Sequence, residues 1–186
     1  MRVIALVPTM PGVALGFSLI ELMTAIAIFG ILVVTAIPMY GTFIANTQIR
    51  TATESMLAGV RLAQTEAVRR NGTVEFLLDP ATGWTVNNVE GNVTTLISGR
   101  SFKEGSEKTA ITAAGAASRI TFNGLGRIVA PSPVDGSAPL RQVDVTTNTS
   151  VSSPRNLRLV IGAGGDAYGI KACDPAVANT EPAGCP

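Results

Sequence analysis

The chain of 186 residues contains no histidine and only two cysteines. Nucleophilic catalysis by Ser or Cys most often depends on a histidine base, so the sequence argues against that class of enzyme. Two cysteines without histidine also cannot close a structural zinc site, which takes four protein ligands. No G-x-G-x-x-G or P-loop pattern occurs in a strand-to-helix setting. We therefore expect no enzymatic activity, no metal and no cofactor.

Two glutamates remain as candidates for carboxylate chemistry. Glu66 and Glu75 can be drawn as a pair, but nothing in their spacing requires one. A solvated helix end explains Glu66 better, and a strand face explains Glu75 better.

Charge is also scarce. Charged residues make up 15% of the chain, and the formal net charge is +1. Bulk electrostatic attraction to nucleic acid or to anionic lipid is therefore not indicated. Both cysteines, Cys173 and Cys185, lie close to the C-terminus. A pair spaced in this way suits one disulfide bond in an oxidising compartment, consistent with a periplasmic domain.

One long apolar run dominates the N-terminal part. Residues 17–37 are 21 consecutive residues in which Glu21 carries the only charge. At about 1.5 Å rise per residue, this run is long enough to cross a hydrocarbon core of about 30 Å. An acidic residue at mid-membrane costs about 2.5 to 3.5 kcal/mol, and somewhat less near the edge. Such a residue usually marks a function and implies a partner.

The residues just before the run can supply that partner. Cleavage after Gly16 would give Phe17 a free amine, four residues before Glu21 on an apolar helix. The amine could pair with Glu21 of the same chain or, in a packed array, with Glu21 of the next subunit. The motif therefore indicates an assembly device. The alternative is an ordinary signal anchor that holds a periplasmic domain and never assembles.

The sequence GFSLIEL at residues 16–22 closely resembles the type III signal, GF(T/S)LIE, of type IV pilins and type II secretion pseudopilins. The resemblance implies that a prepilin peptidase cuts after Gly16, that Phe17 is N-methylated, and that Glu21 guides docking into a helical filament. It also implies that the partners are the prepilin peptidase, other major or minor pilins or pseudopilins, and the inner membrane. The chain would cross that membrane once and become part of a pilus or pseudopilus.

The same resemblance makes residues 1–16 a prepilin leader peptide. This leader departs from the family's usual short and basic pattern, because Arg2 is its only charged residue. The charge bias that would keep the N-terminus cytoplasmic is correspondingly weak. An internal start at Met10 would shorten the leader and leave it without a basic residue.

Beyond the apolar run the pattern becomes amphipathic. We predict one helix over residues 17–70, with a transmembrane and filament-core part at 17–38 and an amphipathic part within 39–72. Asn71-Gly72 ends it, because both residues can adopt the left-handed conformation that closes helices. Apolar residues recur on one face at spacings of three or four, which predicts that this face is buried: Ala52, Met56, Val60, Ala63 and Ala67.

Pro38 interrupts the backbone hydrogen bonding of this helix. It removes one bond and should kink or loosen the turn before it. Pilins often carry a proline at this distance from the cleavage site, and the segment upstream can unwind in assembled filaments. The resemblance therefore gives Pro38 a role in assembly, whereas a simple kink between membrane and domain is the alternative.

After Gly72 the signals change to short β-prone runs and turns. Turns are expected at residues 79–83, 123–126 and 131–133. These elements predict an α+β, pilin-like fold, in which one long N-terminal helix packs on an antiparallel sheet. Residues 73–186 would form the β-rich periplasmic domain. The strands are predicted at residues 74–78, 84–89, 94–97, 109–112, 119–123, 140–146, 156–161 and 167–172.

Further motifs point to a subgroup. Residues 63–72 read AQTEAVRRNG, and Gly83-Trp84 follows the first predicted turn. These motifs resemble the GspH/FimT group of minor pseudopilins and minor pilins. Cys173-Asp174-Pro175 and the second cysteine resemble FimT-type members. The function implied is a structural or priming subunit of a type IV pilus or a type II secretion pseudopilus.

An alternative function is DNA binding during natural transformation. FimT-type pilins can bind DNA through a basic segment just before the first C-terminal cysteine. Here that segment has one cation, Lys171, where the family pattern has two arginines. Arg155 and Arg158 would lie close by on the preceding strand. Because each phosphate contact adds to the affinity, so few cations predict weak binding at best.

Overall fold

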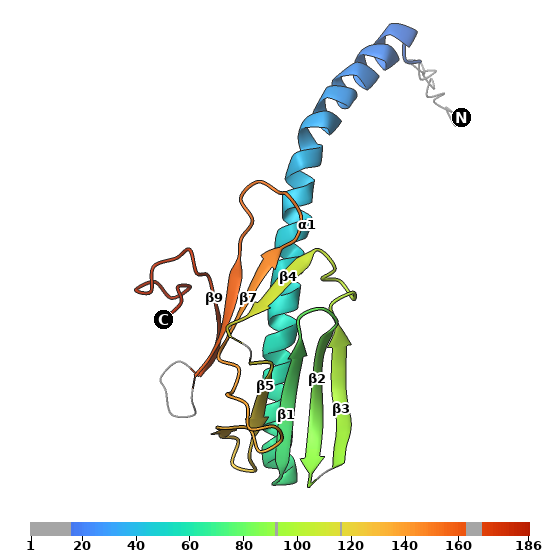
Figure 1. Cartoon of the computed structure of the whole chain (residues 1–186). Helices are drawn as coiled ribbons and strands as arrows, with labels where there is room; N and C mark the ends of the chain where they lie inside the picture. Colours follow the sequence, from blue (N-terminus) through green and yellow to red (C-terminus); the bar gives the residue numbers. More distant parts are fainter. Residues whose placement is uncertain (1–15, 92, 116, 163–168) are drawn as a thin grey trace, which may run out of the picture. The chain divides into compact units, whose positions relative to one another are not determined.

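The computed structural model describes residues 16–91, 93–115, 117–162 and 169–186. They belong to two compact units, Met1–Ile37 and Pro38–Pro186, called unit 1 and unit 2 below. The described part of unit 1 leads into and contains the first part of a helix. Unit 2 contains the rest of that helix and, among the described residues, nine strands in two sheets (Figure 1).

The helix, α1, spans Leu19–Arg70 and has 52 residues. It begins two residues later than predicted and continues through Pro38. Its end matches the prediction, because Asn71 has a positive φ of 48°. The Gly72 N–H donates to the Ala67 carbonyl at 3.1 Å, and the Asn71 N–H donates to the Val68 carbonyl at 3.1 Å. These two bonds form a Schellman cap, with asparagine at the left-handed position that glycine usually takes.

Two antiparallel sheets make up the rest of unit 2. The first has the strand order β3-β2-β1-β5-β6, and the second has the order β4-β7-β8-β9. The first sheet consists of β1 Thr73–Asp79, β2 Gly83–Glu90, β3 Val93–Ser101, β5 Arg119–Phe122 and β6 Ile128–Val129. The second consists of β4 Thr109–Ala113, β7 Gln142–Thr147, β8 Leu157–Ile161 and β9 Ile170–Cys173.

The core lies between α1 and the two sheets. The predicted helix face is confirmed, because its five members are fully buried: Ala52, Met56, Val60, Ala63 and Ala67. On this helix Gly59 permits a close approach, since a Cβ added there would lie 2.9 Å from the rings of Phe76 and Trp84. The Trp84 indole N–H donates to the Ser55 hydroxyl at 2.9 Å. Gly59 and the Ser55 hydroxyl therefore allow the Trp84 ring of β2 to pack closely against the helix.

The predicted strands are found with shifts of a few residues at their ends. The turn predicted at 79–83 joins β1 to β2, where the Asp79 carboxylate accepts bonds from the Ala81 N–H and the Thr82 hydroxyl. The prediction missed β6, because two residues are too few to show a period. The last predicted strand starts among residues 163–168, which lie outside the described residues, and β9 is described as Ile170–Cys173.

Candidate functional site

The predicted cleavage site lies just before the helix. Gly16 and Phe17 are exposed and have no regular secondary structure, and Phe17 is 86% exposed. The helical bonding starts at once, because the Leu22 N–H donates to the Ser18 carbonyl at 3.1 Å. Glu21 lies in the first turn of α1. The leader up to residue 15, with the alternative start at Met10, lies outside the described residues.

The first part of α1, residues 19–37, is an uncovered apolar surface. Every apolar side chain of residues 19–37 is exposed within unit 1. By length and composition, α1 could cross a membrane. Glu21 is the only charged residue in this stretch, and no ion pair involves it among the described residues. An exposed apolar surface of this size marks a contact with a membrane or with another protein, and an ionisable residue within such a contact usually has a partner.

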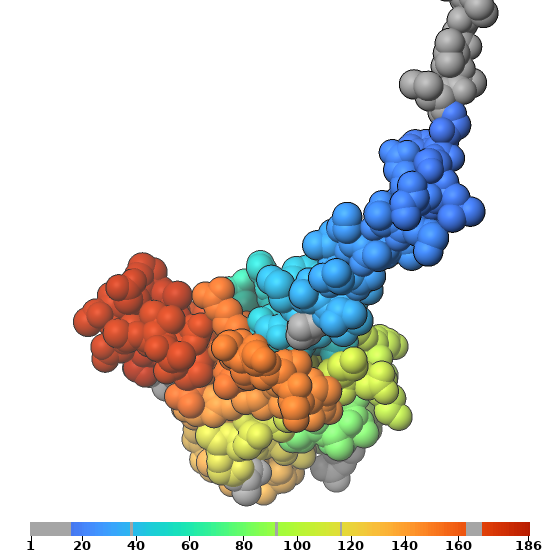
Figure 2. Space-filling model, turned by 90° about the horizontal axis from the view of Figure 1, so that it is seen from above, coloured from blue at the N-terminus to red at the C-terminus, as the bar shows by residue number. Residues whose placement is uncertain are grey.

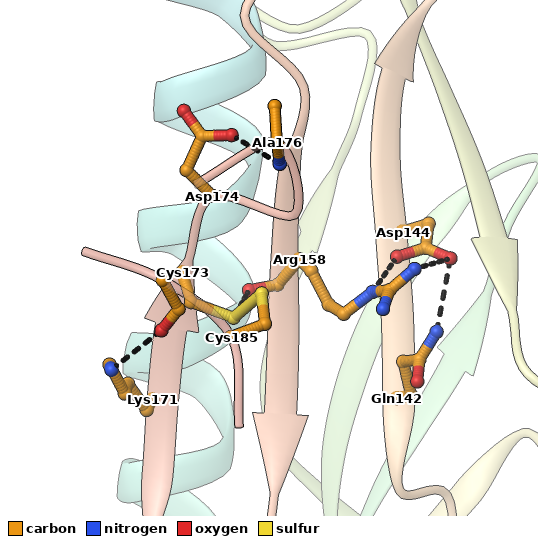
Figure 3. The surroundings of a disulfide bond; sticks show 9 residues. Gln142, Asp144, Arg158, Lys171, Cys173, Asp174, Ala176 and Cys185 are labelled. Atoms are coloured by element: carbon orange, nitrogen blue, oxygen red, sulfur yellow. Dashed lines mark hydrogen bonds and ion pairs between the residues drawn. A yellow bond between two sulfur atoms is a disulfide. The ribbon is translucent and has the colours of Figure 1, made fainter. Parts of the chain in front are cut away.

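The C-terminal residues form a loop closed by the bond between Cys173 and Cys185 (Figure 3). The Asp174 N–H donates to the Ala183 carbonyl at 2.8 Å, and Asp174 pairs with Gly184 in a short bridge. In the space-filling view this C-terminal segment forms a projection at one side of unit 2 (Figure 2). The structure thus contains the disulfide that the spacing of the cysteines predicts.

The three candidate DNA contacts, Arg155, Arg158 and Lys171, all lie near this loop, and each already forms a hydrogen bond within the chain. The Arg158 guanidinium binds Asp144 of β7 at 2.5 and 3.2 Å (Figure 3), and Arg155 binds Asp174 at 3.2 Å. The Lys171 ammonium donates to the Gly184 carbonyl at 2.9 Å. The strand register puts Arg158 and Lys171 on the same face of the second sheet. Two of the three charges are therefore balanced by carboxylates, so these residues give no specific support to a contact with a phosphate backbone.

We expect the disulfide to be complete in protein isolated without a reducing agent. A thiol reagent should label no cysteine of the native, unreduced chain and two cysteines after unfolding and reduction. Closing a loop with a sequence separation of 12 stabilises by about 3 kcal/mol in the chain-entropy model. Cys185→Ser, which frees one thiol, provides the positive control for labelling. Labelling of the unreduced wild-type chain would show that the bridge is absent.

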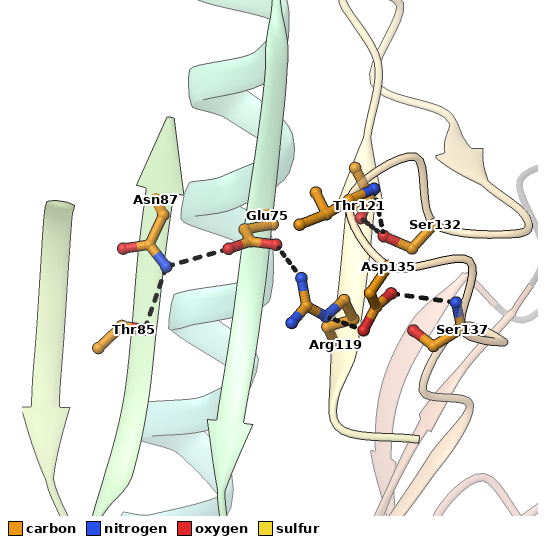
Figure 4. Close-up of polar contacts among 9 residues, drawn as sticks. Glu75, Thr85, Asn87, Arg119, Thr121, Ser132, Asp135 and Ser137 are labelled. Atoms are coloured by element: carbon orange, nitrogen blue, oxygen red, sulfur yellow. Dashed lines mark hydrogen bonds and ion pairs between the residues drawn. The ribbon is translucent and has the colours of Figure 1, made fainter. Parts of the chain in front are cut away.

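A buried polar network is the feature that the sequence did not reveal (Figure 4). Glu75 of β1 is only 4% exposed. Its carboxylate accepts from Arg119 of β5 at 2.9 Å and from Asn87 of β2 at 3.3 Å. The Arg119 Nε lies 3.0 Å from Asp135, which belongs to the loop after β6. Hydrogen bonds from Ser137 lower the pKa of Asp135 below its ordinary value, and Arg119 lowers it further.

This network fastens the loop of residues 131–138 onto the outer face of the first sheet. A second contact, 3.0 Å between the hydroxyls of Thr121 and Ser132, supports the same attachment.

The two glutamates considered for carboxylate chemistry, Glu66 and Glu75, bind different arginines and do not form a pair. Hydrogen bonds from Arg69 and Arg70 lower the pKa of Glu66 to about 2. Glu75 is on a strand as predicted, but it is buried rather than available to a substrate.

Comparisons with known proteins agree with these observations. A family model described as type II transport protein GspH matches residues 52–165, and a model of the prokaryotic N-terminal methylation motif matches residues 14–37. No characterised protein sequence matches significantly. The chain is similar in structure to the type IV minor pilin FimU of Pseudomonas aeruginosa, with a TM-score of 0.50 and 16% identity over 70% of this chain and 91% of FimU.

A second crystal form of FimU gives a TM-score of 0.48 at 16% identity, covering 69% of this chain and 95% of FimU. At this level of identity, the likeness to FimU concerns the fold, one long helix packed on antiparallel sheets. The family match covers more than half of the chain, and the methylation motif lies where the apolar run begins. The chain therefore belongs to the GspH family of minor pilins and pseudopilins.

Proposed function

We propose that the protein is a structural or priming subunit of a helical filament, either a type IV pilus or a type II secretion pseudopilus. The observation that carries the proposal is the uncovered apolar helix of residues 19–37, which follows directly on an exposed Gly16-Phe17 pair. Before assembly, lipid of the inner membrane covers this surface. In the filament, the helices of neighbouring subunits cover it. The protein acts through these contacts and carries out no catalysis.

Removal of the leader creates the cationic partner that the Glu21 carboxylate lacks. A prepilin peptidase removes the leader, residues 1–16, and the new amine of Phe17 is methylated. This cation then lies four residues before Glu21, just ahead of the helix. In the filament, each Glu21 neutralises the amine of the next subunit, which removes the cost of an isolated charge in an apolar environment. Residues 17–38 form the filament core and membrane anchor. Pro38 lies at the transition to the amphipathic part of the helix, residues 39–72, which leads into the periplasmic domain of residues 73–186.

Processing can be tested at Gly16. A Cβ added there meets nothing within 4 Å, so a larger side chain does not disturb the chain's own structure. We expect Gly16→Val to block leader removal when the protein is expressed with its prepilin peptidase, because the peptidase needs a small residue at that position. Gly16→Ala should be processed much better. Mass spectrometry of the purified chains measures both. Equal processing of the two variants would contradict the assignment of the cleavage site.

A further inference from the structure

Among the described strands, the longest free edge belongs to β3. It is the last strand on one side of the first sheet and pairs only with β2 (Figure 1). Its nine residues include four consecutive exposed ones at the start, with Val93 and Leu96 each 64% exposed. The opposite edge of the same sheet, β6, has only two residues. Strand β3 therefore presents the largest row of unpaired backbone groups among the described strands.

This edge has little of the protection that free edges usually carry. Native sheets protect their edges with lysine, proline, short strands or bulges. Strand β3 has neither lysine nor proline, and its single charge, Arg100, is the eighth of nine residues. It does have one bulge, because Val86 pairs with Ser98 and Asn87 pairs with Leu96, which leaves Ile97 without a partner. Four-residue stretches on either side of the bulge remain able to pair.

A depression lies directly beside this edge. It has a volume of about 580 Å³, and its lining includes Leu77 of β1, Thr85 of β2, and Leu96 and Gly99 of β3. Leu77, Thr85 and Gly99 are cross-strand partners in one row, on the sheet face turned away from α1. A Cβ added at Gly99 would lie 3.2 Å from the Thr85 methyl group, so glycine helps to keep the depression open. An edge with a side-chain pocket next to it is the arrangement used in recognition by strand addition.

We propose that β3 is a docking edge for an extended strand of a different pilin-type subunit, with an acidic residue where it passes Arg100. The backbone of the partner supplies the hydrogen bonds, and one of its side chains enters the depression beside Leu96 and Gly99. Arg100 lines the same depression, and its guanidinium has only one contact, to the Glu104 carbonyl at 3.4 Å, within the described part of the chain. This inference rests on the proposed function as a filament subunit.

A second copy of this chain fits the edge poorly. Strand β3 carries one positive charge and no carboxylate, so pairing of β3 with the same strand of a second copy would bring a second Arg100 and no group to neutralise it. Like charges opposite one another destabilise a strand pair. A different subunit that carries a carboxylate at this position avoids the repulsion and pairs with Arg100 instead.

The test uses the full-length chain in cells that assemble the filament, with a photo-crosslinking amino acid at Leu96. Leu125 serves as the matched control site, because it is a leucine with 78% exposure in the turn after β5. We expect Leu96 to crosslink to a strand of a different pilin-type subunit and Leu125 not to reach that strand. A crosslink from Leu96 to a second copy, to a protein outside the pilin class, or to nothing at all would overturn the proposal.

A substitution tests the edge independently. Leu96→Lys places a protecting charge on an exposed position, so it should leave the fold intact and reduce incorporation into the filament about tenfold, whereas Leu125→Lys should not. Leader removal is measured in the same cells. Normal processing with undiminished incorporation of Leu96→Lys would overturn the docking edge alone. Absence of processing in the wild-type chain would instead overturn the proposed function on which it rests.

Discussion

Replacing Arg119 by methionine should destabilise unit 2 by about 3 to 5 kcal/mol, because the change leaves a buried carboxylate without its partner. Arg119 binds Glu75 at 2.9 Å, and the side chains of the two residues are 17% and 5% exposed. The same substitution also removes the contact with Asp135, so the loop of residues 131–138 should loosen. Trp84 is the only tryptophan and lies in the core, so its fluorescence reports denaturant unfolding of this unit.

Two further variants separate the buried charge from the loss of packing. Arg61→Met changes an exposed arginine on α1 and should cost less than about 0.5 kcal/mol. Adding Glu75→Gln to Arg119→Met removes the uncompensated charge and should recover a large part of the loss. If the double variant is as unstable as Arg119→Met alone, the ion pair is not the source of the effect.

Glu21→Val should leave membrane insertion intact or improve it, and should strongly reduce incorporation into the filament. The carboxylate is the only charge in an apolar helix segment, so removing it lowers the cost of insertion by up to about 3 kcal/mol. In the proposed filament, the same change removes the partner of the Phe17 amine in the next subunit. Fractionation of membranes and of sheared filaments measures the two effects separately.

Thr24→Val is the matched control for this prediction. Thr24 lies in the same exposed stretch, and its hydroxyl donates to the Glu21 carbonyl at 2.9 Å within the helix. It therefore tests the loss of a polar side chain one turn away without removing a charge. We expect this variant to assemble normally. Wild-type incorporation of Glu21→Val would show that the carboxylate is not the docking group.

Features that depend on neighbouring residues could be predicted from the sequence. The spacing of Ala52, Met56 and Val60 identified the buried face of α1, and Asn71-Gly72 identified its end. The turn of residues 79–83 identified the first hairpin. In each case the signal lies within a few residues, because helix period, cap and turn are local properties of the chain. The motif at residues 16–22 is likewise contained in a few consecutive residues.

Features that depend on distant residues could not be predicted. Glu75 and Arg119 are 44 positions apart, and no spacing rule relates them. The same holds for Arg158 with Asp144 and Arg155 with Asp174, which reduce the free positive charge beside the C-terminal loop. Sequence counting treats every basic residue as available, whereas the fold pairs two of the three candidate DNA contacts, Arg155 and Arg158 but not Lys171, with carboxylates. The free edge of β3 likewise appears only when the order of strands is known.

The most direct test of this account is the intact mass of the chain recovered from purified filaments. The account predicts a chain that begins at Phe17, carries one added methyl group on its amine, and retains the bond between Cys173 and Cys185. These properties together would show leader removal, methylation and assembly in a single sample. A filament-bound chain that still contains Met1, or the complete absence of the chain from filaments whose other subunits are processed, would contradict the account.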